Sequence, residues 1–509
     1  MLIHDYLFRA AEKFPEKEAI IFSNKRYTYK EVANLSLSIS EWLRSQDLQP
    51  DFRAAILTDN PLDYVTTYFG ILASDGIVVG LNTWTSHRTL ELVVNDCGAS
   101  ILFINSKFLK YIDKIANSIP SVKMIVVAGL QAGTYKSAGF KRLEHSEVVS
   151  FSGQSDTKPA KAVPASIAQI IYTSGTTGKP KGVMLSHANL IANTKSIVKY
   201  LKLSSDDRAM AVLPFFYAYG NSILLTHISV GSTLVINWSF LYPNVILDEM
   251  LKNEVTGFYG TSATYAILLS RSAIREYQFP LLRYIAQSGS AMHNKLIRGL
   301  QKILPDKDIY IMYGQTEAAP RLSYLDPKDI NRKIGSIGKA ISGVVLQLLD
   351  KKGNPVQTGE VGEIVARGDN IMTGYWKKPN ETATVLRPEG LRTGDLAKQD
   401  KEGYLYIVDR KDNMIKSGSH RIAPKEIEEI ICEHESVHEA AVIGVKDEIL
   451  GEAVKACVVL RPGSNCDIKD IIKHCRINLP AYKVPHLVEF YDNLPKTGTG
   501  KIKKLLLKF

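Results

Sequence analysis

Short apolar runs alternate with helical patterns through the first part of the chain, and this alternation limits the possible folds more than any other feature. The runs lie at 54–57, 76–81, 100–104 and 123–129, and the segment 89–98 has the period of an amphipathic helix. Runs of this length that alternate with helices are typical of βα units, whose strands form a parallel sheet. The sequence therefore predicts an α/β fold.

The pattern changes near Val344. Short alternating runs separated by glycine turns follow, and they predict antiparallel strands in a small β-rich subdomain. Mixed α/β character returns with a helix expected at 424–434. At 509 residues the chain exceeds the size at which a single core keeps growing. We therefore expect a large N-terminal domain over 1–409, a hinge at 410–412 and a small α+β C-terminal domain over 413–509.

Composition is that of an ordinary globular protein. Hydrophobic residues make up 45% of the chain and charged residues 23%, so neither disorder nor a fibrous repeat is indicated. Charges interrupt the apolar runs of the segment 1–20, and no run approaches the roughly 20 apolar residues that span a bilayer. The five cysteines form no CxxC pair, which argues against a disulfide framework or a zinc site. We expect a cytoplasmic protein with no integral membrane segment.

The net charge of +11 favours an anionic partner. Nucleic acid, a membrane surface, nucleotide phosphates and an acidic carrier protein all qualify. The basic residues are spread along the chain and are locally dense only at 501–509. Because no zinc-finger spacing or RNA-recognition aromatic motif accompanies them, we expect no nucleic-acid role.

The segment 172–183 reads YTSGTTGKPKGV and follows a run typical of a buried strand. Its small residues let backbone N–H groups approach an anion closely, its hydroxyls are donors, and Lys179 and Lys181 supply positive charge. It is not a Walker A loop, because the second glycine of that pattern would fall on Pro180. The segment predicts a polyphosphate site.

Together the motifs resemble those of the adenylate-forming enzymes, which include acyl- and aryl-CoA synthetases, luciferases and the adenylation domains of nonribosomal peptide synthetases. The segment 172–183 is similar to their signature loop, and the likeness continues in the same order and spacing over nearly the whole chain. The other matching segments are LPFFYAYG (213–220), SGSA (288–291), YGQTEA (313–318), GEIVARGDNIMTGYW (362–376), RTGDLA (392–397), DRKDNMIKSGSHRIAPKEIE (409–428) and PKTGTGKI (495–502).

The resemblance implies a site for ATP and a magnesium ion. Tyr313 is expected to stack on adenine beside Gly314 and Gln315. Thr316 is expected to bind the α-phosphate and Glu317 to ligate Mg²⁺, which prefers carboxylate and phosphate oxygens. The loop residues expected to hold the β- and γ-phosphates are Thr173, Ser174, Gly175, Thr176, Thr177, Gly178 and Lys181.

The ribose and adenine contacts follow from the same resemblance. Asp395 is expected to accept the ribose hydroxyls with Arg410 beside it, since a carboxylate is a strong acceptor. Arg421 is expected near the phosphates in one of two conformations. The small residues expected to line the adenine pocket are Ser288, Gly289, Ser290 and Ala291.

Lys501 matches the family lysine that reaches the α-phosphate and the attacking carboxylate, so we expect it to stabilise charge in the transition state. We expect Lys503 and Lys504 to face water. The family first forms an acyl-adenylate and pyrophosphate, and a thiol then attacks the adenylate. The resemblance implies that a mobile C-terminal domain rotates about Asp412 between these steps and presents the segment 416–420 to the thiol.

The acid pocket departs from the family pattern, because Tyr217 stands where many relatives carry a histidine. Amino-acid-activating relatives place an aspartate where Ala218 lies, and an unpaired ammonium is costly to bury. A fatty or aryl acid is therefore favoured over an amino or imino acid such as proline. The residues expected to line the pocket are Tyr217, Ala218, Asn221, Tyr259, Thr261 and Ser262.

The identity of the thiol stays open, since coenzyme A and the phosphopantetheine of an acidic acyl or peptidyl carrier protein end in the same group. A basic surface suits either partner, and family frequency favours coenzyme A. The predicted function is an AMP-forming acid–CoA ligase, with a stand-alone adenylation enzyme that loads a carrier protein as the alternative. Two other classes of function are alternatives. One is a nucleotide-binding pseudoenzyme, and the other is a phosphate-releasing kinase or ATPase, which would give ADP as product.

Overall fold

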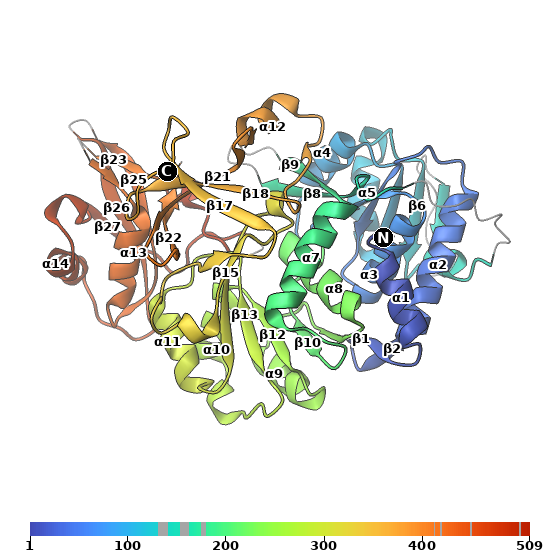
Figure 1. Ribbon diagram of the computed structural model, residues 1–509, viewed down its shortest axis with the longest axis horizontal. Helices are drawn as coiled ribbons and strands as arrows, with labels where there is room; N and C mark the ends of the chain where they lie inside the picture. The colour runs from blue at the N-terminus through green and yellow to red at the C-terminus, as the bar shows by residue number, and fades with distance from the viewer. Residues whose placement is uncertain are drawn as a thin grey trace.

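The computed structural model describes residues 1–130, 141–152, 162–174, 180–411, 413–417, 420–447, 450–497 and 500–508. It confirms the predicted α/β fold class, with two large mixed sheets, a small antiparallel sheet and a separate C-terminal sheet. In Figure 1 the orange and red C-terminal elements lie at one end of the molecule and the blue N-terminal elements at the other. Among the described residues, no helix is long and apolar enough to cross a bilayer.

One sheet of eight strands contains the apolar runs from which the fold class was predicted. Across the sheet its strands are β19 (Gly374–Tyr375), β9 (Pro180–Ser186), β8 (Ile167–Ser174), β4 (Ile77–Gly80), β3 (Arg53–Leu57), β5 (Ile101–Asn105), β6 (Met124–Ala128) and β7 (Lys141–Glu144). Strands β4, β3, β5 and β6 pair in parallel, with Ala54 opposite both Val78 and Ile101. The prediction of βα units with a parallel sheet is therefore confirmed.

The second sheet has nine strands and carries most of the candidate site. Across it the strands are β16 (Lys339–Ala340), β15 (Ser323–Leu325), β14 (Asp308–Tyr313), β13 (Tyr284–Gln287), β12 (Gly257–Gly260), β10 (Arg208–Ala211), β11 (Thr233–Ile236), β1 (Glu18–Phe22) and β2 (Lys25–Thr28). The neighbours β14, β13, β12 and β10 run parallel, so their carboxyl ends lie together at one edge of the sheet.

Helices join the two sheets into one body with a shared core. They are α1 (Asp5–Lys13), α2 (Tyr29–Ser45), α3 (Pro61–Ala73), α4 (His87–Cys97), α5 (Leu109–Ile115), α6 (His145–Val149), α7 (His187–Leu201), α8 (Ala218–Val230), α9 (Pro243–Lys252), α10 (Ser262–Arg271) and α11 (Asn294–Ile303). The same core contains Ala54 of β3, Ile197 of α7, Leu224 of α8 and Ala209 of β10. In Figure 1, α7 and α8 lie near the middle of the molecule.

The antiparallel strands predicted beyond Val344 are confirmed. They form a five-stranded sheet of β17 (Val344–Leu349), β18 (Gly362–Gly368), β21 (Gly390–Gln399), β20 (Leu386–Arg387) and β22 (Leu405–Arg410), next to α12 (Pro379–Val385). A further five-stranded sheet follows, of β24 (His420–Ile422), β23 (Ile415–Ser417), β26 (Gly451–Leu460), β25 (Val437–Asp447) and β27 (Leu487–Phe490), with α13 (Pro424–Glu433) and α14 (Ile468–Asn478). This last unit has its own core, which includes Ile422, Ile427 and Val458.

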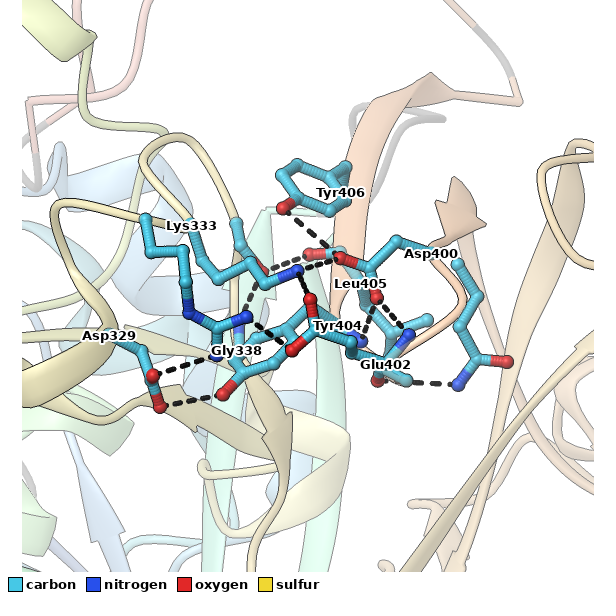
Figure 2. Close-up of polar contacts among 12 residues, drawn as sticks. Asp329, Lys333, Gly338, Asp400, Glu402, Tyr404, Leu405 and Tyr406 are labelled. Atoms are coloured by element: carbon cyan, nitrogen blue, oxygen red, sulfur yellow. Dashed lines mark hydrogen bonds and ion pairs between the residues drawn. The ribbon is translucent and has the colours of Figure 1, made fainter.

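A cluster of charges ties the turn between β21 and β22 to the nine-stranded sheet (Figure 2). Lys333 Nζ lies 2.7 Å from Asp400 Oδ2 and 2.5 Å from Glu402 Oε1. The Tyr404 hydroxyl donates to Asp329 Oδ2 at 2.6 Å. These contacts hold the turn of the hairpin while its two strands run on into the candidate site.

Candidate active site

The site assembles at the carboxyl edge of the nine-stranded sheet. Tyr217 lies after β10 at the N-cap of α8, Thr261 follows β12, Ser288 follows β13 and Tyr313 ends β14. In parallel α/β sheets, ligands bind outside this edge, where the loops leave the strands. The sequence motifs therefore meet because successive strands deliver them to one place.

The segment after β14 turns sharply and presents Glu317. A Cβ on Gly314 would lie 1.9 Å from the Pro320 carbonyl oxygen, so only glycine permits this close approach of backbone. Glu317 Oε1 accepts a hydrogen bond from the Tyr375 hydroxyl at 2.8 Å, and the Glu317 carbonyl accepts from Met372 N at 2.9 Å. The carboxylate is thus held by Tyr375 of β19, and the main chain at Glu317 is held by the segment that joins β18 to β19.

Glu317 suits a magnesium ion of the kind that accompanies nucleotides. Among the described residues, no group of three or more histidine, cysteine or acidic side chains could enclose a metal. Mg²⁺ in phosphate sites is commonly held by one or two carboxylates, with phosphate oxygens and water completing its shell. A single positioned carboxylate therefore fits the expected role.

Asp395 lies where two sheets meet. It pairs across the ladder with Arg410, whose Nε donates to Asp395 Oδ1 at 2.8 Å. The Tyr313 hydroxyl donates to Asp395 Oδ2 at 2.7 Å. Asp395 is 6% exposed, and its charge raises the pKa of Arg410, so the guanidinium stays ionised. The structure thus brings together three residues that the sequence assigned to the nucleoside.

Lys501 lies at the tip of the C-terminal unit, and the charges of this same cluster act on it. Its backbone N–H donates to Thr497 Oγ1 at 3.1 Å, which closes the tip into a turn. The side chain keeps solvent contact, yet desolvation by the surrounding walls lowers its pKa, and the Arg410 guanidinium lowers it further. Asp395 and Glu317 oppose the shift. Solvent screens part of each effect because the side chain is exposed.

The neighbouring Gly500 shows how the two units touch. A Cβ placed on it would lie 3.1 Å from Ala263 Cβ and 3.9 Å from Thr261 Oγ1, at the start of α10. Thr261 is the N-cap of this helix, because its hydroxyl accepts from Thr264 N at 3.3 Å. The tip of the C-terminal unit therefore closes over the predicted acid pocket.

The phosphate loop is described only at its two ends. Thr173 on β8 pairs with Lys181 on β9, and Lys181 Nζ lies 3.3 Å from Glu381 Oε2. The same ammonium lies 5.3 Å from the centre of the Tyr375 ring. The predicted phosphate and hinge residues that lie outside the described residues are Gly175, Thr176, Thr177, Gly178 and Asp412, together with the side chains of Ser174, Lys416, His420 and Arg421.

The segment after β13 is held by side chains from β13 and from the start of α10. Gln287 Nε2 donates to the Ser290 carbonyl at 2.6 Å, and Ser262 Oγ donates to the Ala291 carbonyl at 2.7 Å. Gly289 has a φ of +94°, which favours glycine. The segment therefore forms a turn of small residues fixed by hydrogen bonds at its end.

The predicted acid-pocket residues divide into two groups. Tyr217 and Ala218 lie at the start of α8, where burial raises the pKa of Tyr217 to about 12 and keeps its phenol neutral. Asn221 and Tyr259 lie deeper in the core. Asn221 Nδ2 donates to Gln169 Oε1 at 2.9 Å, and the Tyr259 hydroxyl lies 2.7 Å from that of Tyr284.

One sequence expectation is wrong. Lys504 does not face only water, because its Nζ lies 2.7 Å from Glu428 Oε1, and the Glu428 side chain is 13% exposed. Sequence reasoning also missed Gln287, Tyr375 and Arg321, which contact predicted site residues. Two of them leave a signal in the sequence: Tyr375 lies in the matching segment 362–376, and Arg321 is a lone charge in the run 318–325, which is otherwise uncharged.

Comparison with known proteins matches both parts of the chain to one enzyme family. Residues 7–376 match the AMP-binding enzyme family, and residues 426–501 match the AMP-binding enzyme C-terminal domain. The chain is 31% identical to a long-chain-fatty-acid–CoA ligase of Bacillus subtilis (strain 168), over 98% of this chain and 93% of that protein. It is 33% identical to a feruloyl-CoA synthase of Amycolatopsis sp, over 97% of this chain and 96% of that one.

Solved structures of similar proteins superpose on the whole molecule. An anthranilate CoA ligase in complex with anthranoyl-AMP gives a TM-score of 0.92 at 27% identity, over 100% of this chain and 96% of that chain. The o-succinylbenzoate coenzyme A synthetase from Bacillus subtilis, in complex with ATP and magnesium ion, gives 0.86 at 26% identity, over 99% of each chain.

Proposed function

Because the chain belongs to the AMP-binding enzyme family, we propose that it activates a carboxylic acid with ATP and transfers the acyl group to coenzyme A. The resemblance seen in the motifs is thereby confirmed at the level of the family, and an AMP-forming acid–CoA ligase is the reaction class that the relatives support. The observation that supports the proposal is that Arg410 and Tyr313 bond to Asp395, while Gly500, next to Lys501, lies against Ala263 at the start of α10.

The chain's own residues account for the first half-reaction. A carboxylate that attacks an α-phosphate meets like charge, so the site must neutralise charge and hold both groups in line. Asp395 would accept the ribose hydroxyls and Thr316 would donate to the α-phosphate. A magnesium ion held by Glu317 would neutralise phosphate charge. Lys501 would stabilise the charge that develops between the acid and the phosphate.

In the second half-reaction a thiol must reach the acyl-adenylate, so the C-terminal domain must move away from the acyl group. The five-stranded sheet that ends with β22 stops at Arg410, and the next strand begins at Ile415. We place the hinge between them at 410–412, with the domains at 1–409 and 413–509. Coenzyme A is the acceptor named for the relatives. The phosphopantetheine of a carrier protein is the alternative.

The direct test is ATP–pyrophosphate exchange with a panel of fatty, aryl and amino acids. Exchange with a fatty or aryl acid, followed by thioester formation with free coenzyme A, is the expected result. Exchange only with an amino or imino acid would point to the loading of a carrier protein. Formation of ADP in place of AMP and pyrophosphate would overturn the proposal.

The hinge has its own test. In Asp412→Pro we expect adenylation to proceed and thioester formation to fail, because a fixed φ at the hinge restricts the rotation between the two states. The measurement compares pyrophosphate exchange with coenzyme A acylation in the same preparation. Equal loss of both steps would show that Asp412 has no special part in the domain movement.

A further inference from the structure

Arg321 is the most deeply buried arginine that the structure describes, with 1% of its surface exposed. It follows the turn that carries Glu317. The Arg321 carbonyl accepts hydrogen bonds from Asn193 Nδ2 and Asn370 Nδ2, each at 2.9 Å. The main chain is therefore held from two sides at the point where the side chain leaves it.

The guanidinium has polar neighbours but no counter-charge. Its Nη1 donates to Ser288 Oγ at 2.8 Å, and its central carbon lies 4.9 Å from the centre of the Tyr219 ring. Its Nε has no acceptor. Among the described residues, no carboxylate forms an ion pair with Arg321. The nearby phenols of Tyr200 and Tyr219 stay neutral, because burial raises the pKa of both.

Arg392 shows how the same chain treats another buried arginine. Arg392 is 9% exposed, and it pairs with two carboxylates, Glu363 at 3.0 Å and Glu389 at 2.8 Å. Burying a charge is costly unless it is paired and hydrogen-bonded. Arg321 is buried more deeply than Arg392 and has no acidic partner among the described residues. A bound anion would supply the negative charge that is missing beside it.

The position of Arg321 identifies the part of the cleft that it serves. It bonds to Ser288, the first residue of the predicted adenine segment, and its Cα would lie 3.0 Å from a Cβ on Gly314. The Tyr219 ring under its guanidinium belongs to α8, directly after the predicted pocket residues Tyr217 and Ala218, and its centre lies 6.4 Å from that of the Tyr259 ring. Arg321 thus lies between the predicted adenine segment and the predicted acid pocket.

We infer that Arg321 selects an acid with a second carboxylate, remote from the carboxylate that is activated. Guanidinium and carboxylate match as planar groups that share two hydrogen bonds, and the Nε edge of the fork is available for this pairing. The distal carboxylate would supply the missing counter-charge at the far end of the acid. This inference rests on the proposed function and specifies its substrate class.

The test compares acids in matched pairs that differ only in the distal carboxylate, such as hexanoate with adipate, octanoate with suberate, and benzoate with terephthalate. We expect the wild-type enzyme to favour the dicarboxylic member of at least one pair in kcat/KM for pyrophosphate exchange. In Arg321→Met we expect this preference to fall by about 100-fold or more, since the buried partner charge is lost. Arg321→Lys keeps the positive charge but loses the planar guanidinium. Its preference for the dicarboxylic acid should lie between those of the wild type and Arg321→Met.

Thermal denaturation separates this role from a structural one. Removal of an uncompensated buried charge should leave the melting temperature of the free enzyme unchanged or raised in Arg321→Met. The matched control is Arg283→Met, which breaks the 2.6 Å ion pair with Asp207 at the opposite edge of the sheet. We expect this control to lower the melting temperature and to keep the acid preference.

The outcomes also separate the inference from the proposed function. An unchanged preference in Arg321→Met, or a wild-type preference for distal hydroxyl or carbonyl groups, would overturn the inference and leave the ligase assignment standing. If no acid supports exchange, the proposed function fails. In that case the melting temperature is measured with each dicarboxylic acid and a non-hydrolysable ATP analogue. A rise in the wild type that is absent in Arg321→Met supports the inference, and equal shifts in the two proteins overturn it.

Discussion

At the scale of single residues, the proposed site depends on a lysine near charges of both signs. Desolvation and Arg410 lower the pKa of Lys501, and Asp395 and Glu317 oppose the shift. Lys503, two residues away, is exposed, as is Lys501. We therefore expect the position of each lysine at the tip, and not its exposure, to decide its role.

This difference gives the first prediction. In Lys501→Ala we expect pyrophosphate exchange to fall by about 10²–10³-fold, because a preorganised positive charge is removed from the transition state. Coenzyme A acylation from a supplied acyl-adenylate should be retained. Lys503→Ala removes the same charge from the same tip and should keep exchange. Equal losses in the two variants would mean that the net charge of the tip, and not the position of Lys501, matters.

At the scale of elements, the hairpin of β21 and β22 is held at both ends. Its strands carry Asp395 and Arg410 into the site, and its turn is held by Lys333 through Asp400 and Glu402. The Lys333 side chain is 9% exposed, although the acids around it are more open to solvent. The contacts in Figure 2 thus hold the turn of the hairpin whose strands carry Asp395 and Arg410.

We expect Lys333→Met to lower the melting temperature and to raise the KM for ATP, because the hairpin loses the contact that fixes its turn. Higher salt should reduce the difference from the wild type, since partly exposed charges are screened. Lys398→Met on the same hairpin is the control, because Lys398 is exposed on β21. If the two variants behave alike, the charge cluster does not position the nucleoside residues.

At the scale of the whole molecule, the proposed function requires the two units to close. Gly500 has a φ of +81°, and a Cβ on it would meet Ala263. In Gly500→Ala we expect exchange to fall by about tenfold, which corresponds to roughly 1.4 kcal/mol, with coenzyme A acylation from a supplied acyl-adenylate retained. Gly463→Ala is the control, because Gly463 has a φ of +77° and open space around it. A similar loss in that control would assign the effect to backbone strain alone.

Acid should destabilise the large N-terminal body through buried histidines such as His187 and His227. Burial lowers the pKa of His187 and of His227 from 6.5 to about 4. Because the unfolded chain binds these protons more readily, the stability they contribute is fully present above pH 6.5 and is lost as the pH falls towards 4. Each contributes roughly 3 kcal/mol over this window.

Urea unfolding at a series of pH values between 7.5 and 4.5 measures this effect. We expect the slope of the unfolding free energy against pH to become shallower in His227→Gln, because one of the buried histidines no longer titrates. His87→Gln is the control, since His87 is exposed. An unchanged slope in His227→Gln would show that His227 is not a source of the acid sensitivity.

The sequence by itself determined the elements, their order and the family. The runs at 54–57 and 100–104 predicted strands because hydrophobic periodicity is local, and β3 and β5 lie on them. The motif YGQTEA fixed the identity of the residues that follow β14, since its chemistry lies within six consecutive positions. Local patterns of this kind predict an element without information about the segments that pack against it.

Only the tertiary structure decided which of these residues meet. Tyr313 and Asp395 are 82 positions apart and share a hydrogen bond because two sheets adjoin at that point. The ion pair of Lys504 with Glu428 and the burial of Arg321 without an acid likewise depend on packing between segments distant in sequence. Such contacts are set by sheet register and by the docking of whole units, and no local pattern encodes them.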